Sequence, residues 1–208
     1  MLKFNRSVEI AKKQFPKLSI KYKNESYLMK LLGMVLFFNR GFGSKYITTI
    51  GNTIYFPSKQ FIENNETSSI IVLCHELVHI KQKQSVDLFE LEYLFPQVIS
   101  LFSLFAFFNI YFLLFLLFLL PIPSITRFMF EYEAYLVTIY CKKKLNLNYN
   151  IENIIKQFTG PDYYFMYPFK DNVKTMLDIG VNMMDNESFY CFGIKDTVDQ
   201  IMEVLDGS

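Results

Sequence analysis

Histidine is scarce in this chain: two of the 208 residues are histidines, and tryptophan is absent. Charged residues make up 20% of the chain, whereas a soluble domain has about a quarter, and hydrophobic residues make up 51%. Intrinsically disordered chains combine low hydrophobicity with high charge, so this composition excludes that class. We expect a folded chain with a single domain over residues 1–208.

Tracts rich in lysine or arginine are also missing. The 21 basic and 20 acidic residues nearly cancel, and no basic cluster provides the electrostatic footprint of a nucleic-acid-binding protein. The first twenty positions lack the apolar run that a secretory signal contains. We therefore expect no nucleic-acid partner and no secretion. The frequent Asn, Lys, Ile, Phe and Tyr suggest an AT-rich genome, as in a phage or a low-GC bacterium.

Cysteines are few, and their spacing is uninformative for metal binding. Cys74, Cys141 and Cys191 form no CxxC pair, so a disulfide framework or a cysteine zinc site is not indicated, and a reducing compartment fits. We expect all three to be small core residues.

Both histidines fall in one motif, His75-Glu76-Leu77-Val78-His79, which has the form HExxH. Two randomly placed histidines would show this spacing in about 1 of 100 such chains, and the glutamate lowers this to roughly 1 in 2000. Apolar residues surround the motif and predict a buried helix starting near Asn65 or Thr67. Histidines four apart on a helix can bind one Zn²⁺, and Glu76 can take the proton of a zinc-bound water.

A catalytic zinc site needs three protein ligands and a water. Because no third histidine exists, we expect a carboxylate, with a cysteine as the less favoured alternative. Metzincins have a histidine six positions after the second one, and Ser85 stands there, which excludes that class. Glu131 and Glu133, on a second amphipathic helix predicted from Ser124 to Lys143, are the candidate carboxylates.

The HELVH motif and the later Glu131-Tyr132-Glu133-Ala134 resemble the gluzincin metallopeptidases, in particular the membrane-associated peptidases of the M48 type. The resemblance implies a zincin-like fold, Glu131 as the third ligand and Ala134 packed against the active-site helix. It also implies that an edge strand near Tyr55 holds substrate by backbone pairing. The family pattern ends in Asp, and Tyr135 stands at that position here.

From Tyr93 to Thr126 the chain has no charged residue, and its centre is long enough to read as membrane-spanning. A single crossing would separate the histidines from Glu131 by a hydrocarbon layer of about 30 Å, and two full crossings need about 40 residues. We therefore expect residues 94–123 to form a hydrophobic helical hairpin. Its two arms, each about 18 Å long, would turn near Asn109 and contact one membrane leaflet or a partner protein. A hairpin covered by protein, as soluble core, is the alternative.

Basic residues flank this segment on both sides and favour a cytoplasmic location for both of its ends. They are Lys81, Lys83, Arg127 and Lys142–Lys144. We expect a membrane-associated protein with its active site on the cytoplasmic side, or alternatively a component of a phage virion.

Other elements follow from local patterns. We expect a helix before Pro16, a helix over 26–38 that stops at Asn39-Arg40-Gly41, and short helices near 151–158 and 195–205. A β-hairpin from Ile47 to Phe56 would turn at Gly51-Asn52.

Together these features predict an α+β protein, mainly helical with a small β-hairpin or sheet, that hydrolyses peptide bonds of a peptide or protein substrate with Zn²⁺. His75, His79 and Glu131 would bind the metal, with Glu133 as an alternative, and Glu76 would be the general base. Hydrogen-bond donors for the developing oxyanion would come from Tyr163, Tyr164 or Arg127. The alternative is a non-catalytic structural or anchoring protein with a stabilising or vestigial zinc site.

Overall fold

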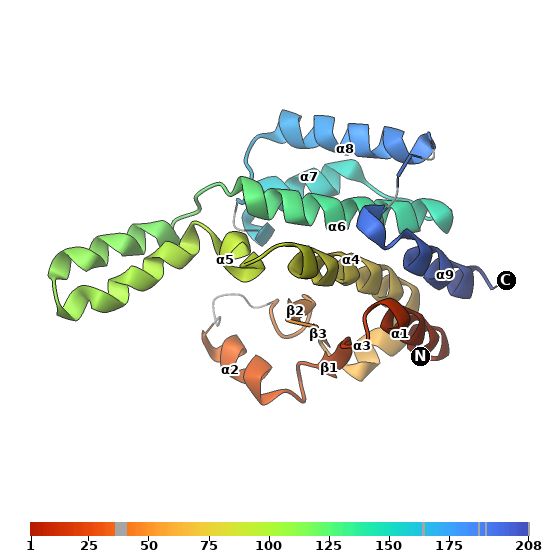
Figure 1. Cartoon of the computed structure of the whole chain (residues 1–208), viewed down its shortest axis with the longest axis horizontal. Coiled ribbons are helices and arrows are strands. Elements are labelled where there is room, and N and C mark those ends of the chain that lie inside the picture. Colours follow the sequence, from red (N-terminus) through yellow and green to blue (C-terminus); the bar gives the residue numbers. More distant parts are fainter. Residues whose placement is uncertain (36–40, 164, 187, 190, 208) are drawn as a thin grey trace. The chain divides into compact units, whose positions relative to one another are not determined.

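The computed structural model describes residues 1–35, 41–163, 165–186, 188–189 and 191–207. The protein is mainly helical with a small three-stranded mixed sheet, which confirms the α+β class at that level (Figure 1). The chain divides into two compact units. Unit 1 comprises Met1–Lys81, Cys141–Leu147 and Tyr190–Ser208, and unit 2 comprises Gln82–Tyr140 and Asn148–Phe189.

The sheet belongs to unit 1 and has the strand order β1-β3-β2. Its strands are β1 (Ser19–Tyr22), β2 (Thr48–Ile50) and β3 (Thr53–Phe56). β2 and β3 are antiparallel, and Gly51 at the turn between them has a φ of 62°, so the predicted hairpin is confirmed. β1 is not among the elements that the sequence predicts, because it pairs in parallel with a strand far along the chain.

β3 is the central strand of this sheet. The backbone of Tyr55 faces Lys21 of β1 on one side and Thr48 of β2 on the other. The strand that we expect from the family resemblance to hold substrate at an edge is therefore enclosed between two others. That expectation is wrong for β3, because the unpredicted strand β1 occupies the position beside it.

Helices make up the rest of unit 1. They are α1 (Leu2–Gln14), α2 (Tyr27–Val35), α3 (Lys59–Asn64), the larger part of α4 (Glu66–Ser85), the end of α6 (Ile125–Lys144), the short η4 (Cys191–Gly193) and α9 (Lys195–Asp206). The helices predicted before Pro16 and at 195–205 are confirmed as α1 and α9. The predicted stop of the helix over 26–38 lies mostly outside the described residues.

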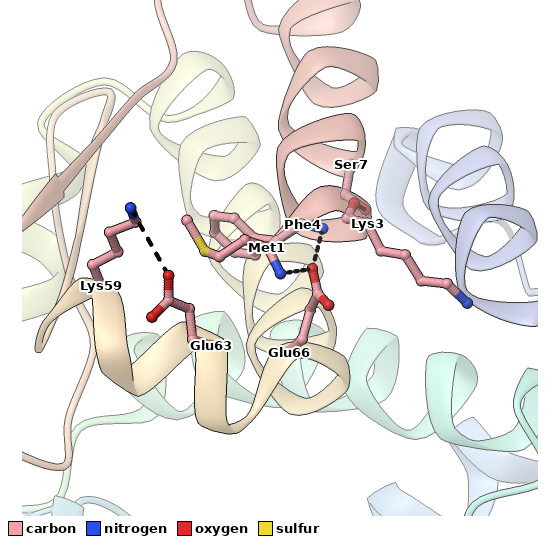
Figure 2. A network of polar contacts seen from close by, with 7 residues as sticks. All are labelled: Met1, Lys3, Phe4, Ser7, Lys59, Glu63 and Glu66. Atoms are coloured by element: carbon pink, nitrogen blue, oxygen red, sulfur yellow. Dashed lines mark hydrogen bonds and ion pairs between the residues drawn. The ribbon is translucent and has the colours of Figure 1, made fainter.

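Glu66, the first residue of α4, ties this helix to α1 (Figure 2). Its Oε1 accepts a hydrogen bond from the backbone N–H of Phe4 at 3.0 Å and forms an ion pair with the amino group of Met1. These contacts, first of all the hydrogen bond from the amino group, lower the pKa of Glu66. A carboxylate at the first turn also interacts favourably with the helix dipole. The start of α4 is thereby fixed next to the predicted Asn65.

Unit 2 contains the rest of α4 and α6 and, among the described residues, six further helical elements. These are α5 (Phe89–Leu94), η1 (Gln97–Phe107), η2 (Ile110–Leu119), α7 (Ile151–Thr159), the short η3 (Pro161–Tyr163) and α8 (Lys170–Asp185). The helices predicted from Ser124 to Lys143 and near 151–158 are confirmed as α6 and α7. A Cβ at Gly180 would lie 2.4 Å from Cδ2 of Leu136, so glycine lets α8 pack closely on α6.

The charge-free segment forms two 3-10 helices, η1 and η2, which follow α5 and precede α6 in the chain and pack against each other. In Figure 1 they form the yellow-green to green hairpin that extends to the left of α5 and α6. Asn109 stands between them, and its side chain accepts a hydrogen bond from the backbone N–H of Tyr111 at 3.0 Å. The expected arm length of about 18 Å was based on the rise of an α-helix. Phenylalanine recurs at every third position of this segment, and a 3-10 helix places side chains with that spacing on one face. Among the described residues, no helix combines the length and apolarity needed to cross a membrane.

Candidate metal centre

His75 and His79 occupy the middle of α4, within unit 1. Their imidazole rings lie on the same face of the helix, with centroids 5.1 Å apart, and both side chains are largely enclosed, with 7% and 9% exposed. The neighbouring apolar residues Leu73, Leu77 and Val78 are fully buried, so the predicted buried helix is confirmed. Two imidazoles therefore stand one turn apart in the core.

Glu76 lies beside the histidines and is also buried, with 8% of its surface exposed. Its Oε2 accepts a hydrogen bond of 2.6 Å from the Thr49 hydroxyl on β2. A charge-assisted bond of this length holds the carboxylate in one orientation. The sequence places Thr49 in a strand, but the contact with α4 depends on the packing of the sheet against the helix.

Lys23 is a second group near Glu76 that sequence reasoning misses. Its side chain is buried, and its Nζ donates to the carbonyl oxygen of Phe42 at 2.7 Å and lies 4.0 Å from the centroid of that ring. Burial lowers the pKa of Lys23 to about 8, while the charge of Glu76 acts in the opposite direction. The only local signal is a lysine directly after a short strand, and that pattern is common on surfaces.

Glu131 lies on α6, within unit 2, and is 2% exposed. Its Oε1 accepts a hydrogen bond of 2.5 Å from the Tyr93 hydroxyl at the end of α5. Burial, followed by the charge of Glu131, raises the pKa of Tyr93 well above its usual value. Tyr93 therefore stays protonated and acts as a hydrogen-bond donor to the carboxylate.

Glu133, the alternative ligand, has a different environment. Its Oε2 accepts a hydrogen bond of 2.8 Å from the amide of Gln82, which also donates to the carbonyl oxygen of Phe130 at 3.0 Å. Glu133 thus takes part in joining the end of α4 to α6 within unit 2. Two residues apart on a helix point to different sides, so Glu131 and Glu133 cannot both share the environment of Tyr93.

Two of the three candidate donors for an oxyanion, Arg127 and Tyr163, are among the residues that the structure describes. The guanidinium carbon of Arg127 is 5.1 Å from the ring centroid of Tyr93 and 6.0 Å from that of Tyr163. Burial, and next the charge of Glu131, raises the pKa of Tyr163 well above its usual value. Arg127 and Tyr163 therefore belong to the same cluster as Glu131, and Tyr164 lies outside the described residues.

Tyr135, which stands where the family pattern has Asp, belongs to this cluster as well. Its hydroxyl donates to Oε1 of Gln157 at 2.6 Å and lies 3.1 Å from the Tyr163 hydroxyl. Ala134, beside it, is fully buried. The phenol thus makes polar contacts within unit 2 that connect α6, α7 and η3.

All three cysteines are buried, as predicted. Burial, followed by a hydrogen bond with Cys74, raises the pKa of Cys141 well above its usual value. Burial also raises the pKa of Cys191 to about 12. Metal binding requires a thiolate, so these environments disfavour Cys141 and Cys191 as the third ligand.

Scans of protein-family models, of curated proteins and of solved structures found no match to this chain. The likeness to gluzincins therefore depends on the motif residues themselves.

Proposed function

We propose that the protein is a zinc-dependent peptidase in which His75, His79 and Glu131 bind Zn²⁺ and Glu76 is the general base. One observation carries this proposal: the HExxH motif lies on a helix inside the core, with both imidazoles and the carboxylate between them buried. Burying polar and charged groups is costly unless they are paired or bound to a metal. If the motif had arisen by chance on an exposed helix, its side chains would not have this energetic cost.

The donor set suits zinc. Two imidazole nitrogens and one carboxylate oxygen match the ligands of catalytic sites that keep a position open for water, and these three residues form a group that could hold one ion. Glu131 is favoured over Glu133 because it is the more deeply buried carboxylate and its bond from Tyr93 can orient it. Such outer contacts orient metal ligands in known sites.

Each proposed site residue has a separate role in the reaction. A zinc ion held by His75, His79 and Glu131 would supply a water with a pKa of about 7 and a charge that polarises the scissile carbonyl. Glu76 would accept a proton from the attacking water and later donate it to the leaving amine. Thr49 engages Oε2 of Glu76 and so leaves Oε1 for this transfer. Arg127 and the protonated Tyr163 are the proposed donors to the oxyanion.

The test uses the full chain with a fluorescently labelled unfolded protein as substrate. We expect wild-type protein to contain about one zinc per chain by elemental analysis and to release peptides. Glu76→Gln should keep the metal and lose hydrolysis, whereas His79→Ala should lose both. Hydrolysis retained by Glu76→Gln would refute the mechanism.

The second candidate is a non-catalytic anchoring protein with a structural zinc site, including a virion component. The exposed apolar side chains of η1 and η2 favour it, because they need a partner that catalysis does not require. The two candidates differ in the fourth coordination position. A water there, replaced by a hydroxamate inhibitor, supports the peptidase, and a fourth protein ligand supports the anchor.

A further inference from the structure

The contact between η1 and η2 consists of phenylalanine rings that recur at every third position. Ring centroids of Phe102 and Phe115 are 5.4 Å apart, and those of Phe105 and Phe112 are 5.9 Å apart. In a 3-10 helix, residues three apart lie above one another, so each arm presents one row of rings to the other. The two arms therefore face each other with one row each, although Phe102 and Phe105 stay 50% and 44% exposed, and their remaining faces point to the surroundings.

Most of the remaining surface is apolar and exposed, whereas the third row of η1 is Ser100, Ser103 and Ala106. Two outward rows of η2 consist of leucines, and one outward row of η1 is apolar. In these rows Leu104 is 70% exposed, Leu114 61% and Leu117 58%. The complete rows are Leu113, Leu116 and Leu119; Leu114, Leu117 and Leu120; and Leu101, Leu104 and Phe107. Soluble proteins rarely expose contiguous apolar surface of this kind.

We propose that η1 and η2 insert together into one leaflet of a lipid bilayer. A protein groove or a second copy of the chain would cover one side of the hairpin and leave the other rows in water. Because apolar rows face several directions and no charge occurs from Tyr93 to Thr126, an apolar solvent that surrounds the arms fits them better. The backbone N–H and C=O groups within each arm pair along the 3-10 helix, as hydrocarbon requires.

The dimensions of the hairpin match one leaflet. Arms of 11 and 10 residues with a rise of about 2.0 Å per residue are about 20 Å long. Half of a bilayer, with about 15 Å of hydrocarbon and an interfacial layer of about 6 Å, has the same thickness. Both arms lead back into unit 2 through α5 and α6, so this unit stays on one side of the membrane.

The apolar surface of the hairpin continues beyond the two arms. Exposed Leu91 and Leu94 extend it onto α5. The proposal is independent of the metal site and of peptidase activity.

The absence of tryptophan allows a sharp test of depth. In Leu116→Trp the introduced indole is the sole tryptophan and lies on an outward row of η2. With phosphatidylcholine vesicles we expect its fluorescence to shift to the blue and to be quenched by lipids brominated on their acyl chains. Ile179→Trp on α8, where Ile179 is 54% exposed, is the matched control and should show neither change.

Vesicle flotation of the full chain gives the second measurement. Wild-type protein should float with phosphatidylcholine vesicles at low and high salt, because apolar burial and not charge holds it. Leu114→Asp with Leu117→Asp should lower partitioning about a hundredfold, and Ile179→Asp should not. The proposal is overturned by binding that requires anionic phosphatidylserine and disappears in salt. It is equally overturned by a lipid-free oligomer that the paired substitution dissociates, or by a monomer that binds no vesicle.

Discussion

Tyr93 offers the most direct test of the proposed metal centre, because the readout needs no substrate. Its hydroxyl donates a hydrogen bond of 2.5 Å to Oε1 of Glu131, whose carboxylate is buried. Tyr93→Phe removes this oxygen and keeps the ring. If Glu131 is a ligand, the substitution removes the contact at Oε1 that orients its carboxylate.

The size of the effect follows from similar contacts. Removing an outer hydrogen bond from a metal ligand lowers affinity about 10- to 100-fold, which corresponds to about 1.4–2.7 kcal/mol. We therefore expect the zinc dissociation constant of Tyr93→Phe, measured by competition with a chelating dye, to rise by that factor. Thermal unfolding of the metal-free proteins separates this effect from a general loss of stability.

Tyr135→Phe is the matched control. It removes a hydroxyl from the same cluster, but that hydroxyl contacts Gln157 and Tyr163. We expect its zinc affinity to stay within about threefold of wild type. An unchanged affinity in Tyr93→Phe, or an equal loss in both variants, would refute the assignment of Glu131 as an oriented ligand.

Three further predictions concern other contacts. Thr49→Val should lower kcat about 10-fold or more with little change in KM or zinc content, because the 2.6 Å hydrogen bond to the general base Glu76 disappears. Thr49→Ser keeps a hydroxyl and should retain most of the wild-type kcat. Equal activity in the wild type and both variants would contradict the positioning role of Thr49. Lys23→Met removes an ammonium whose pKa is lowered from 10.5 to about 8 in the folded protein. The unfolded chain binds this proton more tightly, so the wild type should gain stability relative to the variant as the pH rises from about 8 toward 10.5. Denaturant unfolding at several pH values measures this difference. Gly180→Ala should destabilise the protein by about 1–3 kcal/mol in the same assay, because its Cβ would lie 2.4 Å from Leu136.

Local patterns predicted much of the fold. The repeating apolar positions of α4, α6, α7 and α9, and the glycine turn of the β2–β3 hairpin, depend on neighbours in the sequence. β1 and α8 were beyond such reasoning for different reasons. β1 has only four residues and pairs with a distant strand, and α8 depends on a glycine that permits close packing against Leu136.

The candidate site shows the same division. HExxH is a local motif, so His75, Glu76 and His79 could be found by reading along the chain. Thr49, Lys23 and Tyr93 could not, because each meets its partner through packing. Glu131 and Glu133 were indistinguishable from residue type alone, and the structure gives them different partners in Tyr93 and Gln82.

The sequence by itself determined that this chain has one possible imidazole pair and one long stretch without charge, because both properties depend only on which residues are present and how they are spaced. Tertiary structure decided what surrounds them. Packing buried Glu76 against the hydroxyl of Thr49, enclosed Glu131 beside Tyr93, and folded the charge-free stretch into two 3-10 arms joined by phenylalanine rings. These contacts join residues far apart in the chain, and only the folded core brings them within bonding distance.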